Sequence, residues 1–401
     1  MEIRPIISAL LRNKVGAILI ALQVAITLAV ISNAVFIISE RQSYISRPTG
    51  LDLDNTFAMS IVTIESSEDI PDMMTRELDI LRGTDGVTAA TVMRAFPMSG
   101  STWCNTYKTS PDAESGDDIC QFWIDQAGDK ILDLKFIEGG FFKPSDIRYR
   151  RSRAPTEVSR ALISKSIAEQ FFPGEKALGK LLYDSDPDAP PVEVVGVYET
   201  LIGGHVHGED TYDNMLLPEV VYDQMQHYVV RTAPGKQAQV MTDLEQKLGQ
   251  LPNRMITRIR SMEEYKERNY SSDLAMIKIL STVIALLAAI TALGVLGLAW
   301  FNVNKRRKQI GTRRALGATR IDIIRYFMVE NWLITSAGLV FGVFLALLLN
   351  YQLDSIFQVG KMNFAYILTG MVALWIIGQL AVIVPAKRAS SISPAIATRT
   401  A

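Results

Sequence analysis

Four long apolar runs constrain this 401-residue chain more than any other feature of its sequence. A helix needs about 20 apolar residues to cross about 30 Å of hydrocarbon, and each run is long enough. We therefore predict membrane-spanning helices at residues 15–38, 278–304, 331–350 and 364–384. The first run is too long for the apolar core of a secretory signal peptide, and no small-residue cleavage motif follows it, so we expect it to remain as an anchor.

Basic residues predict the orientation, because cytoplasmic segments beside membrane spans carry an excess of Lys and Arg. Eight basic residues lie in the segment 305–330, whereas the segment 351–363 contains one. We therefore expect the amphipathic segment 1–14 and the tail 385–401 to be cytoplasmic, together with 305–330. We expect residues 39–277 and the short loop 351–363 to lie together on the opposite, external side of the membrane. A basic segment beside apolar runs is the usual topology signal, so nucleic-acid binding is disfavoured.

The long segment between the first two spans has the size of a folded domain. It is acidic, with 38 Asp and Glu against 25 Lys and Arg, although the formal net charge of the chain is only −1. Strand-like runs lie at residues 57–64, 192–198 and 228–232, and helical spacing marks 72–82 and 240–251. The expected fold is an α-helical membrane protein with four transmembrane helices and a large α+β domain inserted between helices 1 and 2.

Both cysteines, Cys104 and Cys120, lie in this external segment. An oxidising compartment would permit a disulfide between them across a loop of about 16 residues, and two unpaired thiols are the alternative. Residues 99–118 and 183–191 are rich in Ser, Asp, Pro and Gly, so we predict that both are surface loops.

A capping-box pattern at Ser261 and Glu264 predicts the start of a helix. Neither Pro nor Gly follows until Gly294, so we predict one helix over residues 262–303. Its first turns would extend about 25 Å beyond the membrane at 1.5 Å per residue, as a rigid rod continuous with a span. The alternative is a break within residues 269–272.

The sequence contains no HExxH, CxxC, GxSxG or GxGxxG motif. Residues 174–180, GEKALGK, match the first seven positions of a phosphate-binding P-loop, but Leu181 stands where a Ser or Thr hydroxyl must reach Mg²⁺. His205 and His207 would need further ligands to hold a metal, so we expect a mobile glycine-rich loop there. We predict that the chain is not an enzyme and binds no metal or cofactor.

The predicted spans contain essentially no ionisable side chain of the kind that marks an ion or proton pathway. Gln23 and Gln379 carry amides that can bond a neighbouring helix. Small residues recur at close-packing spacing, namely Ala21, Ala25 and Ala29 in the first span and the GxxxG pair Gly338 and Gly342 in the third. We therefore expect helix packing or dimerisation rather than a solute pore.

Residues 306–331, RRKQIGTRRALGATRIDIIRYFMVEN, resemble the cytoplasmic motif of the FtsX-like permeases. Residues 136–146 (FIEGGFFKPSD), 161–180 and 192–199 resemble the periplasmic core domain of the narrower MacB-type group, and 385–399 resemble the tail after the last span. This resemblance covers nearly the whole chain. It implies that residues 174–180, which look like a P-loop, form a turn that is typical of the MacB-type core domain. It implies a MacB-type ABC transporter permease of the bacterial inner membrane, with its large α+β domain in the periplasm.

The resemblance also implies partners. A second permease subunit, identical or different, would complete a dimer. MacB carries its ATPase fused at the N-terminus, whereas this chain begins about 14 residues before its first span, so we expect a separate ATP-binding subunit. ATP and Mg²⁺ would then bind that partner rather than this chain. A periplasmic adaptor and an outer-membrane channel are further expected partners.

In this family the segment between the second and third spans docks on the ATPase. The matching positions are Gly311, Arg313, Arg314, Ala315, Leu316, Gly317, Ala318, Thr319 and Asp322. Arginine offers several donors to carboxylates, and we expect an apolar ridge beside the glycine turn. The residues of that ridge are Ile310, Leu316, Ile321 and Ile324. The alternative is a basic loop that faces lipid and only sets the topology.

The function we expect is mechanical. Motion of the ATPase would pass through the helix over 262–303 to the periplasmic domain, for export of a drug, peptide or other envelope substrate. A lipoprotein-releasing permease is one alternative. An FtsX-type regulator of a cell-wall hydrolase, which moves no solute, is another, and a stand-alone receptor or scaffold is the third.

Overall fold

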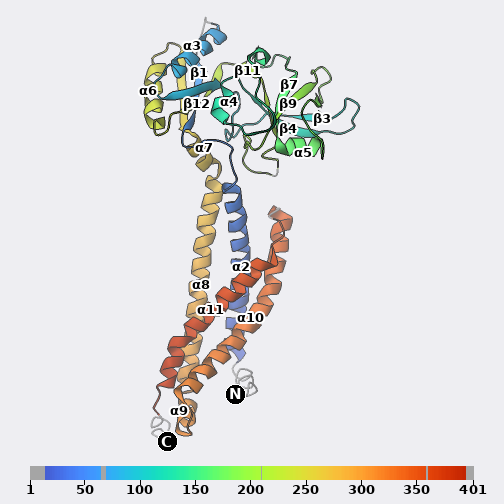
Figure 1. Cartoon of the computed structure of the whole chain (residues 1–401). Coiled ribbons are helices and arrows are strands. Elements are labelled where there is room, and N and C mark those ends of the chain that lie inside the picture. The colour runs from blue at the N-terminus through green and yellow to red at the C-terminus, as the bar shows by residue number, and fades with distance from the viewer. Residues whose placement is uncertain (1–13, 65–68, 209, 358–359, 394–401) are drawn as a thin grey trace. The chain divides into compact units, whose positions relative to one another are not determined.

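The computed structural model describes residues 14–64, 69–208, 210–357 and 360–393. The chain divides into two compact units, each described here by itself. The helical unit comprises residues 1–43 and 272–401, and the core domain comprises residues 44–271 (Figure 1).

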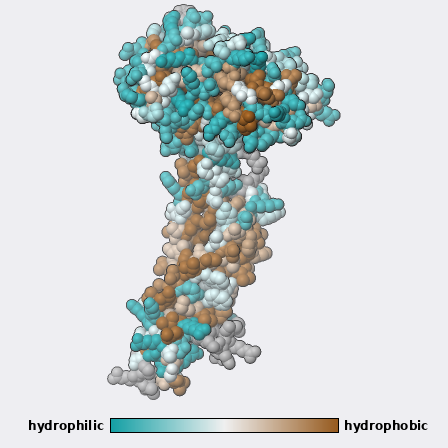
Figure 2. All heavy atoms as spheres, in the orientation of Figure 1, coloured by the Kyte–Doolittle hydropathy of each residue, from teal (hydrophilic) through white to brown (hydrophobic). Residues whose placement is uncertain are grey.

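The helical unit is built from long apolar helices. Among the residues that the structure describes, four helices are long and apolar enough to cross a membrane. They are α2 (Lys14–Ile45), α8 (Ser271–Lys305), α10 (Arg320–Phe357) and α11 (Phe364–Ser390). Figure 2 shows apolar side chains over the middle of this unit and hydrophilic ones towards the end that carries the short helix α9 (Arg307–Ala315).

These helices contain the four predicted spans and continue past them. The helix α10 begins inside the segment assigned to the cytoplasm and ends inside the predicted short loop 351–363. The helix α11 continues through Pro385 to Ser390. Helical hydrogen bonding does not stop where the apolar run stops, so the apolar runs underestimate the helix lengths.

The predicted single helix over residues 262–303 is wrong. Instead, α7 (Met262–Asn269) ends before α8 begins, and Tyr270 between them has non-helical backbone angles. Tyr270 is buried in the core domain, and the Asn269 side-chain amide donates to the carbonyl oxygen of Met98 at 2.8 Å. These tertiary contacts offset the lost helical hydrogen bonds and produce the break that was the alternative prediction.

The first layer of the core domain is a four-stranded antiparallel sheet, ordered β13-β1-β12-β2 and packed against two helices. The strands are β1 (Thr56–Thr63), β2 (Val87–Val92), β12 (Met225–Thr232) and β13 (Arg254–Ser261), and the helices are α3 (Ile70–Arg82) and α6 (Gln237–Gly249). The apolar face predicted for α6 packs into this layer, because Val240, Leu244 and Leu248 are buried in one cluster with strand residues.

A buried ion pair joins this layer internally. The Arg254 guanidinium on β13 binds both carboxylate oxygens of Glu77 on α3, with Nη2 to Oε2 at 2.7 Å. Tyr228 donates its hydroxyl to the same carboxylate, and Arg254 also donates to the Thr63 hydroxyl. Every charged atom of the pair therefore has a specific partner, which is the condition for a stable buried pair.

The second layer is a seven-stranded mixed sheet, ordered β5-β9-β7-β10-β4-β3-β8. Its strands are β3 (Cys104–Lys108), β4 (Asp117–Trp123), β5 (Phe136–Gly139), β7 (Arg160–Ser164), β8 (Leu181–Asp184), β9 (Val192–Tyr198) and β10 (Asn214–Leu217). A two-stranded parallel sheet and short helices complete the domain. They are β6 (Arg148–Arg151), β11 (Glu219–Tyr222), α4 (Gly128–Leu132), α5 (Lys165–Phe171) and η1 (Pro144–Asp146).

The α+β composition matches the sequence-based prediction, but both predicted loops are wrong in part. Residues 99–118 contain the whole of β3 and the start of β4, which pair antiparallel. The polar composition of this stretch reflects a hairpin whose strands are partly exposed. The predicted loop 183–191 likewise begins inside β8.

Candidate functional site

The coupling positions lie on a helical hairpin formed by α9 and the start of α10. Gly317 forms the turn with φ +99°, a left-handed conformation that favours glycine. Its N–H donates to the Arg314 carbonyl oxygen at 3.2 Å, and the N–H of Ala318 donates to that of Arg313 at 3.0 Å. This pair of bonds is a Schellman cap, so α9 ends in a defined geometry.

A second cap starts α10 immediately after that turn. Thr319 donates its N–H and its hydroxyl to Asp322 Oδ2, at 2.9 and 2.6 Å, and its hydroxyl oxygen accepts the Asp322 N–H at 3.3 Å. The carboxylate also lies at a helix N-terminus, where the helix dipole stabilises a negative charge. Thr319 and Asp322 therefore shape the hairpin, and the two caps together leave little freedom at the turn.

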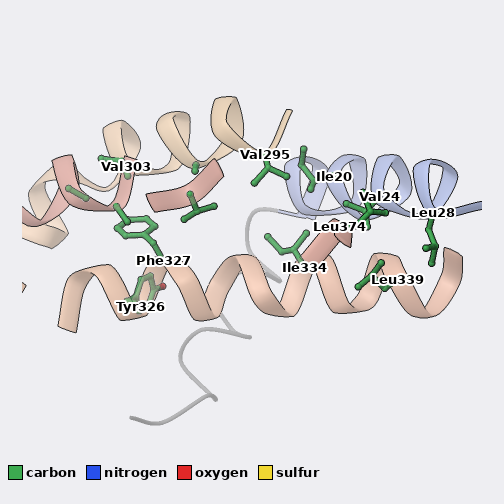
Figure 3. Close-up of a cluster of buried hydrophobic side chains, with 14 of the residues drawn as sticks. Ile20, Val24, Leu28, Val295, Val303, Tyr326, Phe327, Ile334, Leu339 and Leu374 are labelled. Atoms are coloured by element: carbon green, nitrogen blue, oxygen red, sulfur yellow. The ribbon is translucent and has the colours of Figure 1, made fainter. Parts of the chain in front are cut away.

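Buried contacts hold the hairpin to the helical unit. The side chains of Ile310, Ile323 and Phe327 are buried in its apolar cluster, and Figure 3 shows Phe327 and Tyr326 on α10 within that cluster. Arg306 donates from Nη1 to a carboxylate oxygen of Glu330 and to the Tyr326 hydroxyl, both at 3.1 Å. Glu330 is buried, so this ion pair is shielded from solvent. Sequence reasoning missed this ion pair, because Arg306 and Glu330 are distant in sequence and no motif links them.

The end of the hairpin is exposed and carries apolar side chains. We define the hairpin tip as residues 313–322; in it Leu316 is 83% and Ile321 74% exposed. The predicted four-residue ridge is wrong, because Ile310 is buried and Ile324 is half-buried against the cluster. Gly311, assigned to coupling, is also buried. Of the four predicted ridge residues, only Leu316 and Ile321 are exposed enough to contact a partner.

The small residues singled out in the spans lie against one another. A Cβ added at Gly338 on α10 would stand 2.6 Å from the carbonyl oxygen of Ala21 on α2, and one at Gly342 would stand 3.0 Å from the Ala25 Cα. The two helix backbones are therefore in direct contact, as the GxxxG pattern favours. In Figure 3, Val24 and Leu28 of α2 lie near Leu339 of α10 beside this contact.

One of the two predicted span amides bonds a neighbouring helix. Gln23 donates to the Ile290 carbonyl oxygen at 3.0 Å, whereas Nε2 of Gln379 is buried without a hydrogen-bond partner among the described residues. Asn33, which sequence reasoning overlooked, donates to the carbonyl oxygens of Ala29 and Ala346 at 2.9 and 3.1 Å. Ala29 thus supplies an acceptor as well as a small side chain. Such bonds satisfy polar groups that would otherwise face hydrocarbon.

In the core domain, Cys104 and Cys120 lie opposite each other on β3 and β4 and are joined by a disulfide.

The loop that contains His205 and His207 was predicted to be mobile, but His207 packs against aromatic side chains. The His207 ring lies edge-on to Tyr44 and Tyr270, with ring centroids 6.5 and 5.6 Å apart. Within the described part of the chain, no group of three or more His, Cys, Asp or Glu could hold a metal ion.

The P-loop look-alike at residues 174–180 is a turn that leads into the strand β8, whereas a P-loop leads into a helix. Gly174 and Gly179 have φ of +78° and +79°. The Lys180 ammonium pairs with the neighbouring Glu175 carboxylate at 2.7 Å. The glycines therefore serve the turn, and the lysine is an exposed ion-pair partner.

Comparisons with known proteins place these features in a family. Residues 17–247 match the family model of the MacB-like periplasmic core domain, and residues 281–394 match that of the FtsX-like permease C-terminal region. Macrolide export ATP-binding/permease protein MacB 2 of Yersinia pestis is 24% identical over 362 residues, covering 85% of this chain and 50% of that protein. The corresponding MacB of Nitrosomonas europaea is 25% identical over 282 residues, covering 66% and 40%.

A solved structure is also similar. The periplasmic region of MacB from Actinobacillus actinomycetemcomitans is 12% identical, covering 55% of this chain and 94% of that one, with a TM-score of 0.33. The chain spans about half the length of the first curated relatives that it matches. Because the core-domain model alone matches more than half of its residues, the chain belongs to the MacB-like family of ABC transporter permeases, which join a MacB-like periplasmic core domain to an FtsX-like C-terminal region.

Proposed function

We propose that this chain is the permease subunit of a MacB-type transporter that works by transmitting mechanical motion. A separate ATPase subunit binds and hydrolyses ATP with Mg²⁺, and its motion moves the hairpin of α9 and α10. The transported substrate is a drug, a peptide or another envelope molecule. The names of the MacB relatives, which describe macrolide export and ATP binding, support a role in export.

The observation that carries the proposal is the exposed apolar pair at the hairpin tip. Leu316 and Ile321 project from a turn that is capped on both sides, so their exposure does not come from a loose loop. Burying one such side chain on a partner contributes about 1.5–3 kcal/mol. A loop that only sets the topology would need basic residues but no rigid apolar end.

Basic side chains around this pair would fix the orientation of the partner. Arg313 and Arg320 are exposed at the tip, and Arg314 is half-buried there. A guanidinium donates several hydrogen bonds in fixed directions, which suits carboxylates on a docking surface. We therefore expect an acidic, partly apolar cleft on the ATPase.

The packing between α2, α8, α10 and α11 supports motion rather than passage of a solute at this depth. A cavity lined by Ile20, Val295, Phe327 and Glu330 has a volume of about 20 Å³, which is room for about one water molecule. The hydroxyls of Thr27 on α2 and Thr291 on α8 bond each other at 2.9 Å, so polar groups at this depth are used in packing.

The break at Tyr270 changes how motion would reach the core domain. In place of one rigid rod, α7 and α8 meet at a joint whose aromatic ring is buried in the core domain. Tyr44, near the other point where the chain enters that domain, contacts the same His207 ring as Tyr270 does. We propose that this aromatic trio keeps the two entry points together when the helices move.

The proposed assembly follows the family. Two permease subunits, identical or different, form a dimer in the bacterial inner membrane, with both termini and residues 305–330 in the cytoplasm. The core domain then lies in the periplasm, where a periplasmic adaptor and an outer-membrane channel would complete an export path.

Co-purification tests the docking site. The tagged full chain is isolated from its native membrane in mild detergent, and the amount of ATPase that accompanies it is measured. We expect Leu316→Ser, and separately the double change of Arg313 and Arg314 to Glu, to reduce the bound ATPase by about tenfold or more. The matched control is Ile137→Ser, which alters an exposed apolar residue of the core domain.

Two outcomes would overturn the proposal. Full retention of the ATPase by both tip variants would show that it docks elsewhere. Absence of any ATPase from the wild-type preparation, with no effect of the chain on purified candidate ATPases, would remove the transporter interpretation as a whole.

A further inference from the structure

The helical unit contains a pocket of about 170 Å³ where α8 and α11 end beside the start of α9. It is formed by two arginines, one aromatic ring and an apolar floor. The lining residues include Trp300, Val303, Arg307, Pro385, Arg388 and Ile392. None of residues 313–322, the hairpin tip, lines it, so the proposed docking of an ATPase leaves the pocket unused.

The pocket stands at the level where the apolar runs of both helices end. On α8 the predicted span ends at residue 304, and on α11 it ends at residue 384. Phe301 and Val384, close to these ends, are 58% and 51% exposed. Figure 2 shows the surface of the helical unit change from apolar to hydrophilic towards this end. In a membrane, the pocket therefore lies at the level of the lipid headgroups.

The pocket is positively charged. Arg307 and Arg388 are exposed where they line it. The helix α11 contains no Asp or Glu, and neither do residues 274–321. Glu330 is buried and pairs with Arg306 instead. Within the described part of the chain, no carboxylate therefore compensates the two guanidinium groups of the pocket.

An aromatic ring holds one of these arginines in place. The Arg388 guanidinium lies over the ring of Trp300, 4.7 Å from the ring centroid. Stacking of this kind uses the face of the guanidinium and leaves the N–H groups at its edge able to donate. Two parallel N–H groups of an arginine match two oxygens of a phosphate. Tryptophan is also typical of the boundary between membrane and water.

The helix ends around the pocket are compatible with an anion. Arg307 is the first residue of α9, and the dipole at a helix N-terminus favours a negative group. Carbonyl oxygens at the end of α11 would repel an anion, but they already accept hydrogen bonds. That of Arg388 accepts from the Ser391 N–H at 3.2 Å and from the Ser391 hydroxyl at 2.8 Å, and that of Ala389 accepts from the Ile392 N–H at 3.3 Å.

The floor of the pocket distinguishes a lipid from a soluble phosphate. Val303, Pro385 and Ile392 are buried apolar residues. Inorganic phosphate gains nothing from such a floor, whereas the glycerol carbons of a phospholipid would remove apolar surface from water. The volume is below the roughly 300–1,000 Å³ of a site for a drug-sized ligand, so the pocket fits a headgroup and not a whole lipid.

We propose that this pocket binds one anionic phospholipid. Its phosphate accepts hydrogen bonds from Arg307 and Arg388, its glycerol lies on the apolar floor, and its acyl chains lie along the exposed apolar faces of α8 and α11. Basic pockets between membrane helices bind headgroups of this kind. Arg307 belongs to α9 and Arg388 to α11, so the lipid ties the base of the hairpin to the last span. The proposal rests on the proposed insertion of the helical unit in a membrane.

Native mass spectrometry of the full chain in detergent tests lipid binding. Phosphatidylglycerol and phosphatidylcholine with identical acyl chains are the two lipid probes, and glycerol 3-phosphate and inorganic phosphate are the soluble probes. One phosphatidylglycerol per chain should bind at least about tenfold more tightly than phosphatidylcholine, because two arginines near a membrane surface each favour an anionic lipid by about fivefold. The soluble probes at about 10 mM should leave most of this lipid bound, because they cannot use the apolar floor.

Matched variants localise the site. Arg307→Gln and Arg388→Gln should each weaken phosphatidylglycerol binding about fivefold. Arg388→Lys keeps the charge but loses the planar donor pair, so we expect a loss of at most about threefold. The control is Arg320→Gln, which removes an exposed arginine of the hairpin tip and should bind the lipid like the wild type.

Equal affinity for the two lipids would overturn the proposal, as would equal phosphatidylglycerol affinity of Arg307→Gln, Arg388→Gln and Arg320→Gln. Full displacement by glycerol 3-phosphate would overturn the lipid assignment in favour of a soluble phosphate. The assay contains no ATPase, and Leu316→Ser should bind the lipid like the wild type. A failure of lipid binding is therefore distinguishable from a failure of ATPase docking.

Discussion

The contact between α2 and α10 predicts a graded response to added methyl groups. In Gly338→Ala the new Cβ stands 2.6 Å from a carbonyl oxygen and 3.0 Å from the Cα of Ala21, where ordinary contact begins at 3.4 Å. Both atoms belong to backbone, so the helices must move apart by several tenths of an ångström. Such overpacking costs about 1–3 kcal/mol, partly offset by about 1 kcal/mol from the better helix propensity of alanine.

A glycine on α8 provides the control for that propensity term. Gly297 lies in a helix with no heavy atom within 4 Å of an added Cβ, so Gly297→Ala changes propensity alone. The difference between the Gly338 and Gly297 variants therefore isolates the clash, at about 1–3 kcal/mol. Gly342→Ala should fall between them, because its closest contacts, at 3.0 Å, include the end of the Leu28 side chain.

Titration of the detergent-solubilised full chain with SDS measures these differences. Trp332 on α10 stacks on Trp375 of α11 with ring centroids 5.8 Å apart, so near-ultraviolet circular dichroism follows the helical unit. If the Gly338 and Gly297 variants unfold within about 0.3 kcal/mol of each other, α2 and α10 do not pack through these small residues.

Three further predictions concern other contacts. Glu77→Gln should lower the stability of the core domain by about 3–5 kcal/mol in thermal unfolding, because Arg254 stays charged and buried, and joint replacement by Leu and Met should recover most of that loss. Burial, aided by Arg258, lowers the pKa of His227 below its ordinary 6.5. The unfolded chain therefore takes up the proton first as the pH falls, and the melting temperature should drop below about pH 6.5, less steeply in His227→Gln. Gly317→Ala should strain the left-handed turn by about 1–2 kcal/mol and speed hydrogen exchange at the hairpin tip, while Thr319→Ser, which keeps the cap, should not.

Patterns that depend on local chemistry could be predicted from the sequence. The apolar runs lie in α2, α8, α10 and α11, and Ser261 and Glu264 form the expected capping box with two bonds of 3.1 Å. The turn after α9 was open to the same reasoning, since Thr319 and Asp322 have capping spacing and Gly317 stands where a left-handed cap is common.

What could not be predicted depends on residues that are distant in sequence. The break at Tyr270 arises from burial of its ring among core-domain residues and from the bond between Asn269 and Met98. A local pattern of good helix formers carries no information about either contact. Likewise, the order of the strands in both large sheets depends on pairings between segments that are distant in sequence, which periodicity does not reveal.

The basic segment 305–330 combines charge with packing, and this decides which substitution tests docking most cleanly. Arg306 is part of a shielded ion pair with Glu330, and the Arg313 guanidinium lies 4.8 Å from the centroid of the Tyr326 ring. Charge reversal at Arg313 would therefore remove an internal cation–π contact as well as an external donor. Leu316 is mostly exposed, so its replacement by serine leaves the anchoring contacts in place. If the arginine variants lose the ATPase and Leu316→Ser keeps it, the loss reflects a disturbed hairpin rather than a docking surface at the tip.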